Sequence, residues 1–275
     1  MCGIVGAISD KNVIPTLLDG LQRLEYRGYD SAGLAIREAS GELKRFRSLG
    51  KVSVLKDLIE RSAVHGTQGI AHTRWATHGK PAERNAHPHM SGVRVAVVHN
   101  GIIENHNKVR DQLLAAGFSF TSETDTEVVA HLLAHKLEAG LSLLQAVQEA
   151  RREITGAYAL AAASPESPDC IIVTREGSPL VIGVGEGENF IASDVAALLQ
   201  VTRCFIFMEE GDIAEIRRDG ITIHDANGTE VKREVRESRL SPCSADKGVY
   251  RHYMLKEIHE QPGVVAETLE GRIHN

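Results

Sequence analysis

Short apolar runs separated by turn residues fill the second half of the chain, and they constrain its fold more than any other feature. These runs lie at residues 157–163, 170–174, 180–184, 190–192, 205–208, 213–216 and 221–224. Runs of this length between turn residues are typical of buried strands. The dipeptide Asp219-Gly220 between the last two runs predicts a hairpin with a type I′ turn. Direct turns between successive strands favour antiparallel sheets.

The first half of the chain mixes helical and strand-like patterns. Apolar residues from Val13 to Leu24 recur at helical spacing. Similar patterns predict helices at 52–59, 104–116, 126–138 and 143–153. Strands are predicted at 32–36, 69–73 and 93–99, with a hairpin around Gly41. The complete pattern of about ten strands and grouped helices predicts an α+β fold in which amphipathic helices cover antiparallel sheets.

The last forty or so residues differ in composition from this layered part. Residues 236–248 are polar and rich in serine, which indicates a linker after a domain at 2–235. Residues 250–261 are predicted to be helical, with an interruption at Pro262. Because residues 249–275 are too few to build a core of their own, we expect them to be the start of a further domain.

Composition excludes several classes of protein. The 275 residues are 42% hydrophobic and 25% charged, enough for one large domain or somewhat more. The net charge of −6 and the lack of a Lys/Arg run argue against nucleic acid or an anionic membrane as the partner. No apolar run approaches the ~20 residues that span a bilayer. The four cysteines form no CxxC pair, which favours a reducing cytoplasm over a zinc ribbon or a disulfide framework.

Cys2, directly behind Met1, is the first candidate catalytic residue. Removal of Met1 would leave a thiol and an α-amino group on one residue, and the amine has a reference pKa of roughly 7.7–8.0. Such a residue supplies both nucleophile and general base, as in N-terminal nucleophile enzymes. A cysteine at the second position can also be an accident. Residues 3–8 favour the catalytic interpretation, because they predict a buried strand that would hold the nucleophile rigidly.

Arg74 and Trp75 follow the strand predicted at 69–73. The guanidinium of Arg74 offers a planar fork that suits a carboxylate, although a solvated surface arginine is equally open. Trp75, the single tryptophan, could close over a small ligand or act as a packed anchor.

Asn100-Gly101 and Asp125 form a second group of polar candidates. Asn-Gly after an apolar strand favours a turn first, yet the Asn amide and the next backbone N–H also make a pair of oxyanion donors. Thr124 or Asp125 suits the cap of the following helix. Asp125 could instead bind a substrate ammonium.

Three weaker patterns favour ordinary structure. His131 and His135 lie four apart on a predicted helix, but Leu132 replaces the glutamate of a zincin motif, so a surface pair is expected. Residues 183–187 resemble a phosphate loop only superficially, since no Lys-Ser/Thr follows. His87-Pro88-His89 predicts a loop beside the site more than a ligand set. We expect neither a metal nor a cofactor.

Five segments together resemble the class II glutamine amidotransferases. They are residues 2–6 (CGIVG), 23–33 (RLEYRGYDSAG), 72–79 (HTRWATHG), 99–105 (HNGIIEN) and 122–127 (SETDTE). The resemblance runs from Cys2 to about residue 240 and continues through residues 250–254. It implies a four-layer αββα sandwich of the N-terminal nucleophile hydrolase type.

The resemblance also implies a role for each matching residue. Cys2 would be the nucleophile with its freed amine as base, and Asn100 with the Gly101 N–H would form the oxyanion hole. For the substrate glutamine, the α-carboxylate would be held by Arg74, with Thr77 and His78 nearby, and the α-ammonium by Asp125. Trp75 would sit on a mobile covering loop, and Arg27 would lie close to the nucleophile.

The implied reaction is hydrolysis of L-glutamine to glutamate and ammonia through a γ-glutamyl thioester. Within the family the resemblance is to members whose second half converts fructose 6-phosphate to glucosamine 6-phosphate for amino-sugar biosynthesis. We expect residues 249–275 to open that sugar-phosphate isomerase domain, so this chain should be a glutaminase alone. The full-length enzyme is expected to be a homodimer.

Three alternatives remain open from the residues. One is the glutaminase domain of a family member that acts on phosphoribosyl pyrophosphate or aspartate. Another is a different N-terminal nucleophile hydrolase, such as an amidase similar to penicillin acylase. The third is a binding module without catalysis, in which Cys2 would not react with a glutamine analogue.

Overall fold

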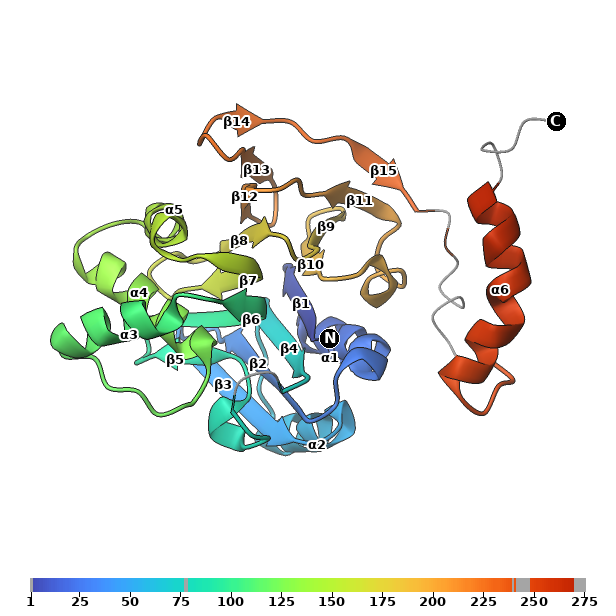
Figure 1. The fold of residues 1–275 in the computed structure, drawn as a ribbon, viewed down its shortest axis with the longest axis horizontal. Coiled ribbons are helices and arrows are strands. Elements are labelled where there is room, and N and C mark those ends of the chain that lie inside the picture. Colours follow the sequence, from blue (N-terminus) through green and yellow to red (C-terminus); the bar gives the residue numbers. More distant parts are fainter. Residues whose placement is uncertain (1, 77–78, 239, 241–247, 270–275) are drawn as a thin grey trace. The chain divides into compact units, whose positions relative to one another are not determined.

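The computed structural model describes residues 2–76, 79–238, 240 and 248–269, and it divides the chain into two units, 1–239 and 240–275. The first unit contains two antiparallel sheets (Figure 1). One sheet has the strand order β15 (Val235–Glu237), β11 (Cys204–Phe207), β9 (Val181–Val184), β10 (Asn189–Ala192), β1 (Gly3–Ile8), β4 (Gln68–Arg74), β2 (Ser31–Arg37) and β3 (Leu43–Leu49). The other has the order β14 (Glu230–Val231), β13 (Ile221–His224), β12 (Ile213–Ile216), β8 (Ile171–Glu176), β7 (Gly156–Ala163), β6 (Val95–Ile103) and β5 (His89–Ser91).

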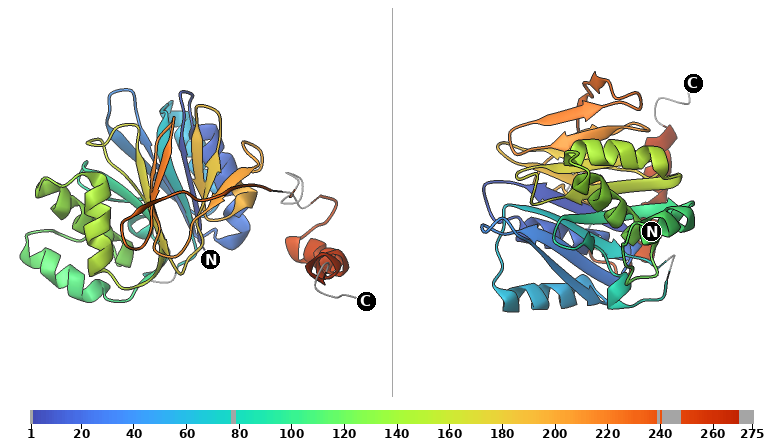
Figure 2. Two further views of the ribbon diagram at one scale, coloured as in Figure 1. Left: turned by 90° about the horizontal axis from the view of Figure 1, so that it is seen from above. Right: turned by 90° about the vertical axis from the view of Figure 1, so that its left-hand side faces the viewer.

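Helices cover the outer face of each sheet, as Figure 2 shows in its left view. Against the first sheet lie α1 (Ile14–Leu24) and α2 (Val52–Ser62), whose apolar residues share one core cluster with those of β1 and β2. Against the second lie α3 (His106–Ala115), α4 (Asp125–Glu138) and α5 (Leu143–Glu153). The single turns η1 (Glu25–Arg27), η2 (Glu83–Asn85) and η3 (Val195–Ala197) connect elements. The predicted four-layer sandwich is confirmed.

Side-chain alternation along the central strands explains why their sequences are continuously apolar. On β1, Val5 and Ala7 belong to the cluster under α1, whereas Ile4 and Ile8 belong to the cluster between the sheets. The same alternation occurs on β6, where Val95 and Val97 face the helices and Ala96 and Val98 face the other sheet. Because successive side chains point to opposite faces, a strand buried on both faces needs apolar residues throughout.

Two turn predictions are wrong. β6 runs through Asn100-Gly101, where Gly101 pairs with Tyr158 of β7, so the pairing with β7 overrides the local turn preference. At the second place the hairpin is present, but four residues, 217–220, connect Ile216 to Ile221, and the Arg217 N–H donates to the Gly220 carbonyl at 2.9 Å. Neither Asp219 nor Gly220 has a positive φ, which a type I′ turn requires.

The second unit contains the helix α6 (Tyr253–Leu269). The predicted interruption at Pro262 is wrong, because the helix continues through that residue. The division between the units falls after residue 239, and β15 includes residues 236 and 237. Most of the segment 236–248, which we propose as a linker before a further domain at 249–275, lies outside the described residues.

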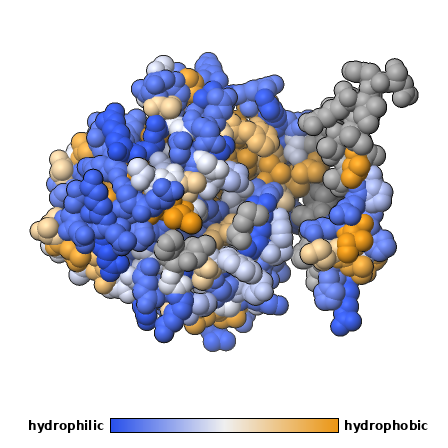
Figure 3. Space-filling view, in the orientation of Figure 1, coloured by the Kyte–Doolittle hydropathy of each residue, from blue (hydrophilic) through white to orange (hydrophobic). Residues whose placement is uncertain are grey.

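The surface of the first unit is mostly hydrophilic over α3, α4 and α5 (Figure 3). Apolar side chains gather over β11 and the turn after η3, where Val201 and Phe207 are partly exposed. Among the described residues no helix has the length and apolar character needed to cross a membrane.

Candidate active site

Cys2 lies at the point where β1 begins, beside the end of β4. Its half-buried Sγ accepts a hydrogen bond from the Trp75 N–H at 3.3 Å and lies 3.5 Å from the Trp75 carbonyl oxygen. Gly3 of β1 pairs with Thr73 of β4. The next residue on each strand is Cys2 on one side and Arg74 on the other, so these two residues lie side by side. A small polar cleft opens here, and its lining residues are Cys2, Arg74, Trp75, His87, His99, Gly101, Thr124, Asp125 and Thr126.

The Cys2 thiol is held in its protonated form. Burial raises the pKa of the thiol above its ordinary value, although the hydrogen bond from the Trp75 N–H and the charge of Arg74 act in the opposite direction. A thiol with a raised pKa carries little thiolate at neutral pH. Nucleophilic attack by this sulfur would therefore need a nearby base to take its proton.

Asn100 and Gly101 lie on β6, across the space between the sheets from Cys2. The Asn100 Nδ2 donates to the Cys2 carbonyl oxygen at 3.2 Å. Gly101 has a φ of 124°, and a Cβ at this position would lie 2.0 Å from the Ala157 carbonyl oxygen. Only glycine fits, since other residues rarely adopt this φ and have no room for a side chain. The strand thus presents an amide side chain and a bare peptide group beside the nucleophile.

Arg74 is a buried arginine at the end of β4. Its Nη2 donates to the Gly79 carbonyl oxygen at 3.2 Å, and its Nη1 lies 3.9 Å from Asp30 Oδ1. Asp30 is itself fixed, because it also accepts hydrogen bonds from the Ala76 N–H and from Ser31 Oγ. The surface-loop alternative for Arg74 is therefore wrong. Asp30 was not among the predicted site residues, although it lies in one of the motifs.

Asp125 is the first residue of α4 and is buried in the cleft wall. Its Oδ2 accepts the Ile103 N–H at 2.8 Å and lies 4.0 Å from His99 Nδ1. The helix cap is Thr124, whose side chain accepts the Glu127 N–H at 3.3 Å. Asp125 is therefore not the cap, and it brings a carboxylate to the same cleft as Arg74. A ligand bearing both an anionic and a cationic group matches this pair of charges.

Buried histidines form the floor behind these residues, and only His87 was singled out in the sequence. The His87 ring lies 4.0 Å from the His72 ring, and its Nδ1 accepts the His99 N–H at 3.4 Å. Its Nε2 therefore carries the proton and donates to Thr126 Oγ1 at 3.1 Å. Burial lowers the pKa of His72 to about 3 and the pKa of His87 well below its ordinary value. Both imidazoles are neutral and weakly basic at pH 7.

The remaining predicted residues are spread more widely. Trp75 lines the cleft with 49% of its surface exposed, and its ring lies edge-on to Tyr29 at 5.9 Å. Arg27 is not among the lining residues, and its guanidinium pairs with the Asp194 carboxylate. Thr77 and His78 lie outside the described residues.

The prediction of a surface pair at His131 and His135 is wrong for His131. This residue is buried against β5, where its Nδ1 bonds Ser91 Oγ at 2.8 Å, while His135 is exposed. Helix α4 is buried over most of its circumference, so residues four apart can differ in exposure. Among the described residues no group of three or more His, Cys, Asp or Glu is placed to hold a metal.

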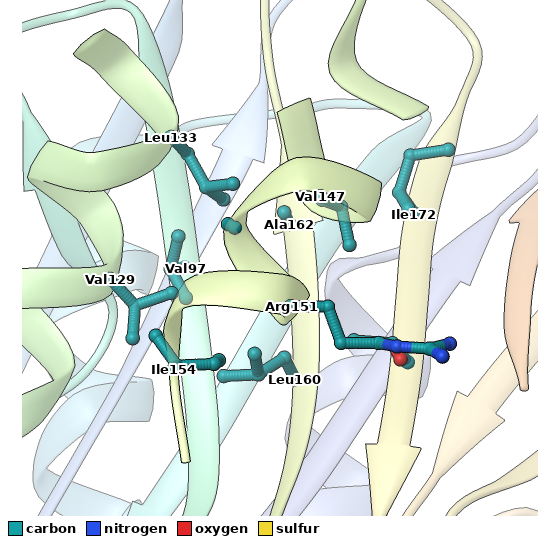
Figure 4. A pocket seen from close by; sticks show the side chains of 11 residues that line it. Val97, Val129, Leu133, Val147, Arg151, Ile154, Leu160, Ala162 and Ile172 are labelled. Atoms are coloured by element: carbon teal, nitrogen blue, oxygen red, sulfur yellow. The ribbon is translucent and has the colours of Figure 1, made fainter. Parts of the chain in front are cut away.

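A second cavity lies between α4, α5 and the second sheet (Figure 4). Aliphatic side chains such as Val129, Leu133 and Leu160 line it, and the Arg151 guanidinium lies to one side. Arg151 donates to the Gly211 carbonyl and, at 2.9 Å, to the Ala226 carbonyl. The cavity is a packing gap in the apolar core, because its lining is aliphatic apart from Arg151 and Thr174, and both of these donate to backbone carbonyls.

Comparison with known proteins gives the family. Residues 72–200 match the family of the glutamine amidotransferase domain. The chain is 58% identical over 273 residues to the glutamine–fructose-6-phosphate aminotransferase [isomerizing] of Pseudomonas aeruginosa and to that of Escherichia coli (strain K12). In both cases the match covers 99% of this chain and 45% of the relative. The chain thus spans about half the length of the curated relatives that it matches.

Solved structures with the same fold carry the same kind of domain. The glutamine phosphoribosylpyrophosphate (PRPP) amidotransferase from B. subtilis, complexed with ADP and GMP, is similar with a TM-score of 0.70 and 26% identity. The match covers 82% of this chain and 49% of that one. A glutamine aminotransferase class-II domain protein from Silicibacter pomeroyi shares the fold at a TM-score of 0.52 and 14% identity. Sequence and fold agree: the chain carries a class II glutamine amidotransferase domain.

Proposed function

We propose that this domain hydrolyses L-glutamine to glutamate and ammonia, with Cys2 as the nucleophile. The observation that carries the proposal is the cleft itself, where the Cys2 thiol shares one small space with Arg74 and Asp125. The guanidinium and the carboxylate suit the α-carboxylate and the α-ammonium of a free amino acid. A bulky amide without an α-carboxylate and an α-ammonium would match neither of these charges, which argues against an acylase for larger substrates.

The base in this proposal is the α-amino group of Cys2 after removal of Met1. Two features support it: burial raises the pKa of the thiol, so the sulfur needs a base, and the neighbouring imidazoles of His72 and His87 are too weakly basic to serve. An amine with an ordinary pKa of roughly 7.7–8.0 is suited to accept the proton near neutral pH. While Met1 is present, the same nitrogen is a peptide amide without basicity.

The reaction then proceeds in two steps. The sulfur attacks the δ-carbonyl carbon of glutamine as its proton passes to the amine, and the resulting oxyanion accepts hydrogen bonds from the Asn100 amide and the Gly101 N–H. Collapse of this intermediate breaks the C–N bond, the amine returns the proton to the leaving ammonia, and a γ-glutamyl thioester remains. Water attacks the thioester and releases glutamate. In this proposal Trp75, Thr77 and His78 complete the substrate site, whereas Arg27, which does not line the cleft and pairs with Asp194, would act close to the nucleophile without binding the substrate.

For the whole protein we propose that the ammonia aminates fructose 6-phosphate to give glucosamine 6-phosphate in a cytoplasmic homodimer. The 58% identity to two aminotransferases named for fructose 6-phosphate supports this acceptor over phosphoribosyl pyrophosphate, since the PRPP amidotransferase is only 26% identical. The acceptor domain would follow residue 249.

A glutaminase assay on chains of defined N-terminus tests the proposal. Protein whose intact mass shows that Met1 is removed should hydrolyse glutamine and take up one equivalent of an electrophilic glutamine analogue. Protein that retains Met1, and Cys2→Ala, should do neither. The rate should not respond to fructose 6-phosphate, and no amino sugar should form. Full activity with Met1 in place would refute the base, and activity of Cys2→Ala would refute the nucleophile.

A further inference from the structure

The amide of Asn100 can contribute to an oxyanion site only if its NH2 end faces Cys2. The two ends of a side-chain amide have nearly the same shape, so packing alone does not choose between them. In the structure the Oδ1 faces His72 Nε2 at 3.0 Å, and the Nδ2 faces the Cys2 carbonyl oxygen at 3.2 Å. The orientation of Asn100 is therefore coupled to the state of His72.

The backbone fixes the position of the His72 ring. His72 lies in the middle of β4, where it pairs with Ile4 of β1 on one side and Gly33 of β2 on the other. Residues directly opposite one another in a sheet point to the same face, and Ile4 belongs to the cluster between the two sheets. His72 thus points across the interface between the sheets and meets Asn100 of β6. It is fully buried there, against the His87 ring.

A carbonyl group fixes the proton on this ring. His72 Nε2 lies 2.9 Å from the His99 carbonyl oxygen, which can only accept a hydrogen bond. Nε2 must therefore carry the proton, because an unprotonated Nε2 would place its lone pair against the lone pairs of the carbonyl oxygen and repel it. A protonated Nε2 in turn requires the oxygen of the Asn100 amide to face it. Burial lowers the pKa of His72 to about 3, so this neutral form persists near pH 7.

We propose that His72 is a positioning residue that holds the Asn100 amide with its NH2 group toward Cys2. The inference rests on the proposed function, because it deepens the account of the oxyanion site. The His99 carbonyl selects the His72 tautomer that has its proton on Nε2. This N–H then selects the orientation in which the Asn100 amide oxygen faces His72. His72 contacts neither the substrate nor the reacting atoms in this scheme.

A double-mutant cycle tests the proposal. His72→Phe removes the donor and keeps a ring of similar size, so only the Cys2 carbonyl still selects the orientation of Asn100, and kcat should fall roughly 10–10²-fold, less than the 10²–10³-fold expected for Asn100→Ala. KM should change little, because the amino-acid clamp is untouched. The double variant should be no slower than Asn100→Ala alone, since the two residues act as one unit. Additive losses, or an unchanged kcat in His72→Phe, would overturn the inference.

A matched control and a second readout separate positioning from general loss of stability. His131→Phe replaces another buried histidine, which bonds Ser91 and lies 3.8 Å from Glu127, and should leave kcat unchanged. If His72→Phe does not fold, His72→Leu removes the same donor with less bulk and enters the same cycle.

The second readout is the pair of Asn100 side-chain NH2 signals in a ¹H–¹⁵N spectrum, identified by their loss in Asn100→Asp. They should move in His72→Phe or His72→Leu and stay in place in His131→Phe. Signals unmoved by loss of His72 would overturn the inference. The NMR readout does not depend on catalysis. A wild-type protein without glutaminase activity would refute the proposed function, while the NMR signals would still test whether His72 orients Asn100.

Discussion

Replacement of Gly101 by alanine tests the tightest backbone approach in the site. The added Cβ would lie 2.0 Å from the Ala157 carbonyl oxygen and 2.8 Å from the Tyr158 Cα, at a residue whose φ is 124°. A non-glycine residue in such a conformation costs of order 1–3 kcal/mol, and overpacking costs typically 1–3 kcal/mol. The free energy of unfolding should therefore fall by roughly 2–6 kcal/mol. Relief of the clash would move β6 away from β7 and displace the Gly101 N–H, so the folded fraction should also lose turnover.

Gly92→Ala is the matched control for this change. Gly92 also has a positive φ, 55°, but a Cβ there would meet no heavy atom within 4 Å. It should cost only the backbone contribution, about 1 kcal/mol. Urea denaturation followed by circular dichroism measures both variants against the wild type, and glutamate release measures turnover. If Gly101→Ala were as stable and active as Gly92→Ala, the close approach of β6 to β7 would be refuted.

Other predictions concern charge. Arg74→Lys keeps the cation but loses the planar fork, so KM for glutamine should rise by a factor equivalent to roughly 1.5–3 kcal/mol, and a change in kcat alone would contradict the carboxylate clamp. The rate at which iodoacetamide alkylates Cys2 should keep rising with pH above the ordinary cysteine pKa, since burial raises the pKa of this thiol, and a plateau near pH 8 in mass-spectrometric labelling would contradict that. Glu127 is buried and, despite the opposing effect of burial, the nearby His131 at 3.8 Å and hydrogen bonds from Thr121 and Ser122 hold its pKa below the ordinary range. Glu127→Gln should lower the free energy of unfolding by roughly 2–3 kcal/mol at pH 7. Because a lowered folded-state pKa stabilises the protein above the unfolded value of about 4.3, this difference should shrink as the pH falls below that value; a pH-independent difference in urea titrations would refute the charge contribution.

Local sequence patterns were sufficient to predict the elements that hold Cys2. The strand at 3–8 and the helix beginning near Val13 follow from apolar spacing, because each pattern reflects burial of one or both faces. The order of the motifs also identified the family, and the comparisons confirm it.

Local preference failed where long-range pairing opposed it. Asn100-Gly101 has the composition of a turn, but Ala159 and Tyr158 of the neighbouring strand pair with it and keep the chain extended. His131 lies on a helix that is covered on most sides, so helical spacing did not predict its burial. In both cases the deciding neighbour lies tens of residues away in sequence, beyond the reach of a short pattern.

The sequence alone determined the residue types at the site, the order of its motifs and the layered α+β class, because these depend on composition and spacing along the chain. Only the tertiary structure decided how the groups act on one another. The Asp30 partner of Arg74, the raised pKa of the Cys2 thiol and the hydrogen bond from His72 to Asn100 all arise across strands that are adjacent in space and distant in sequence. Burial and hydrogen-bond direction depend on what surrounds an atom, and the surroundings exist only after the two sheets have packed together.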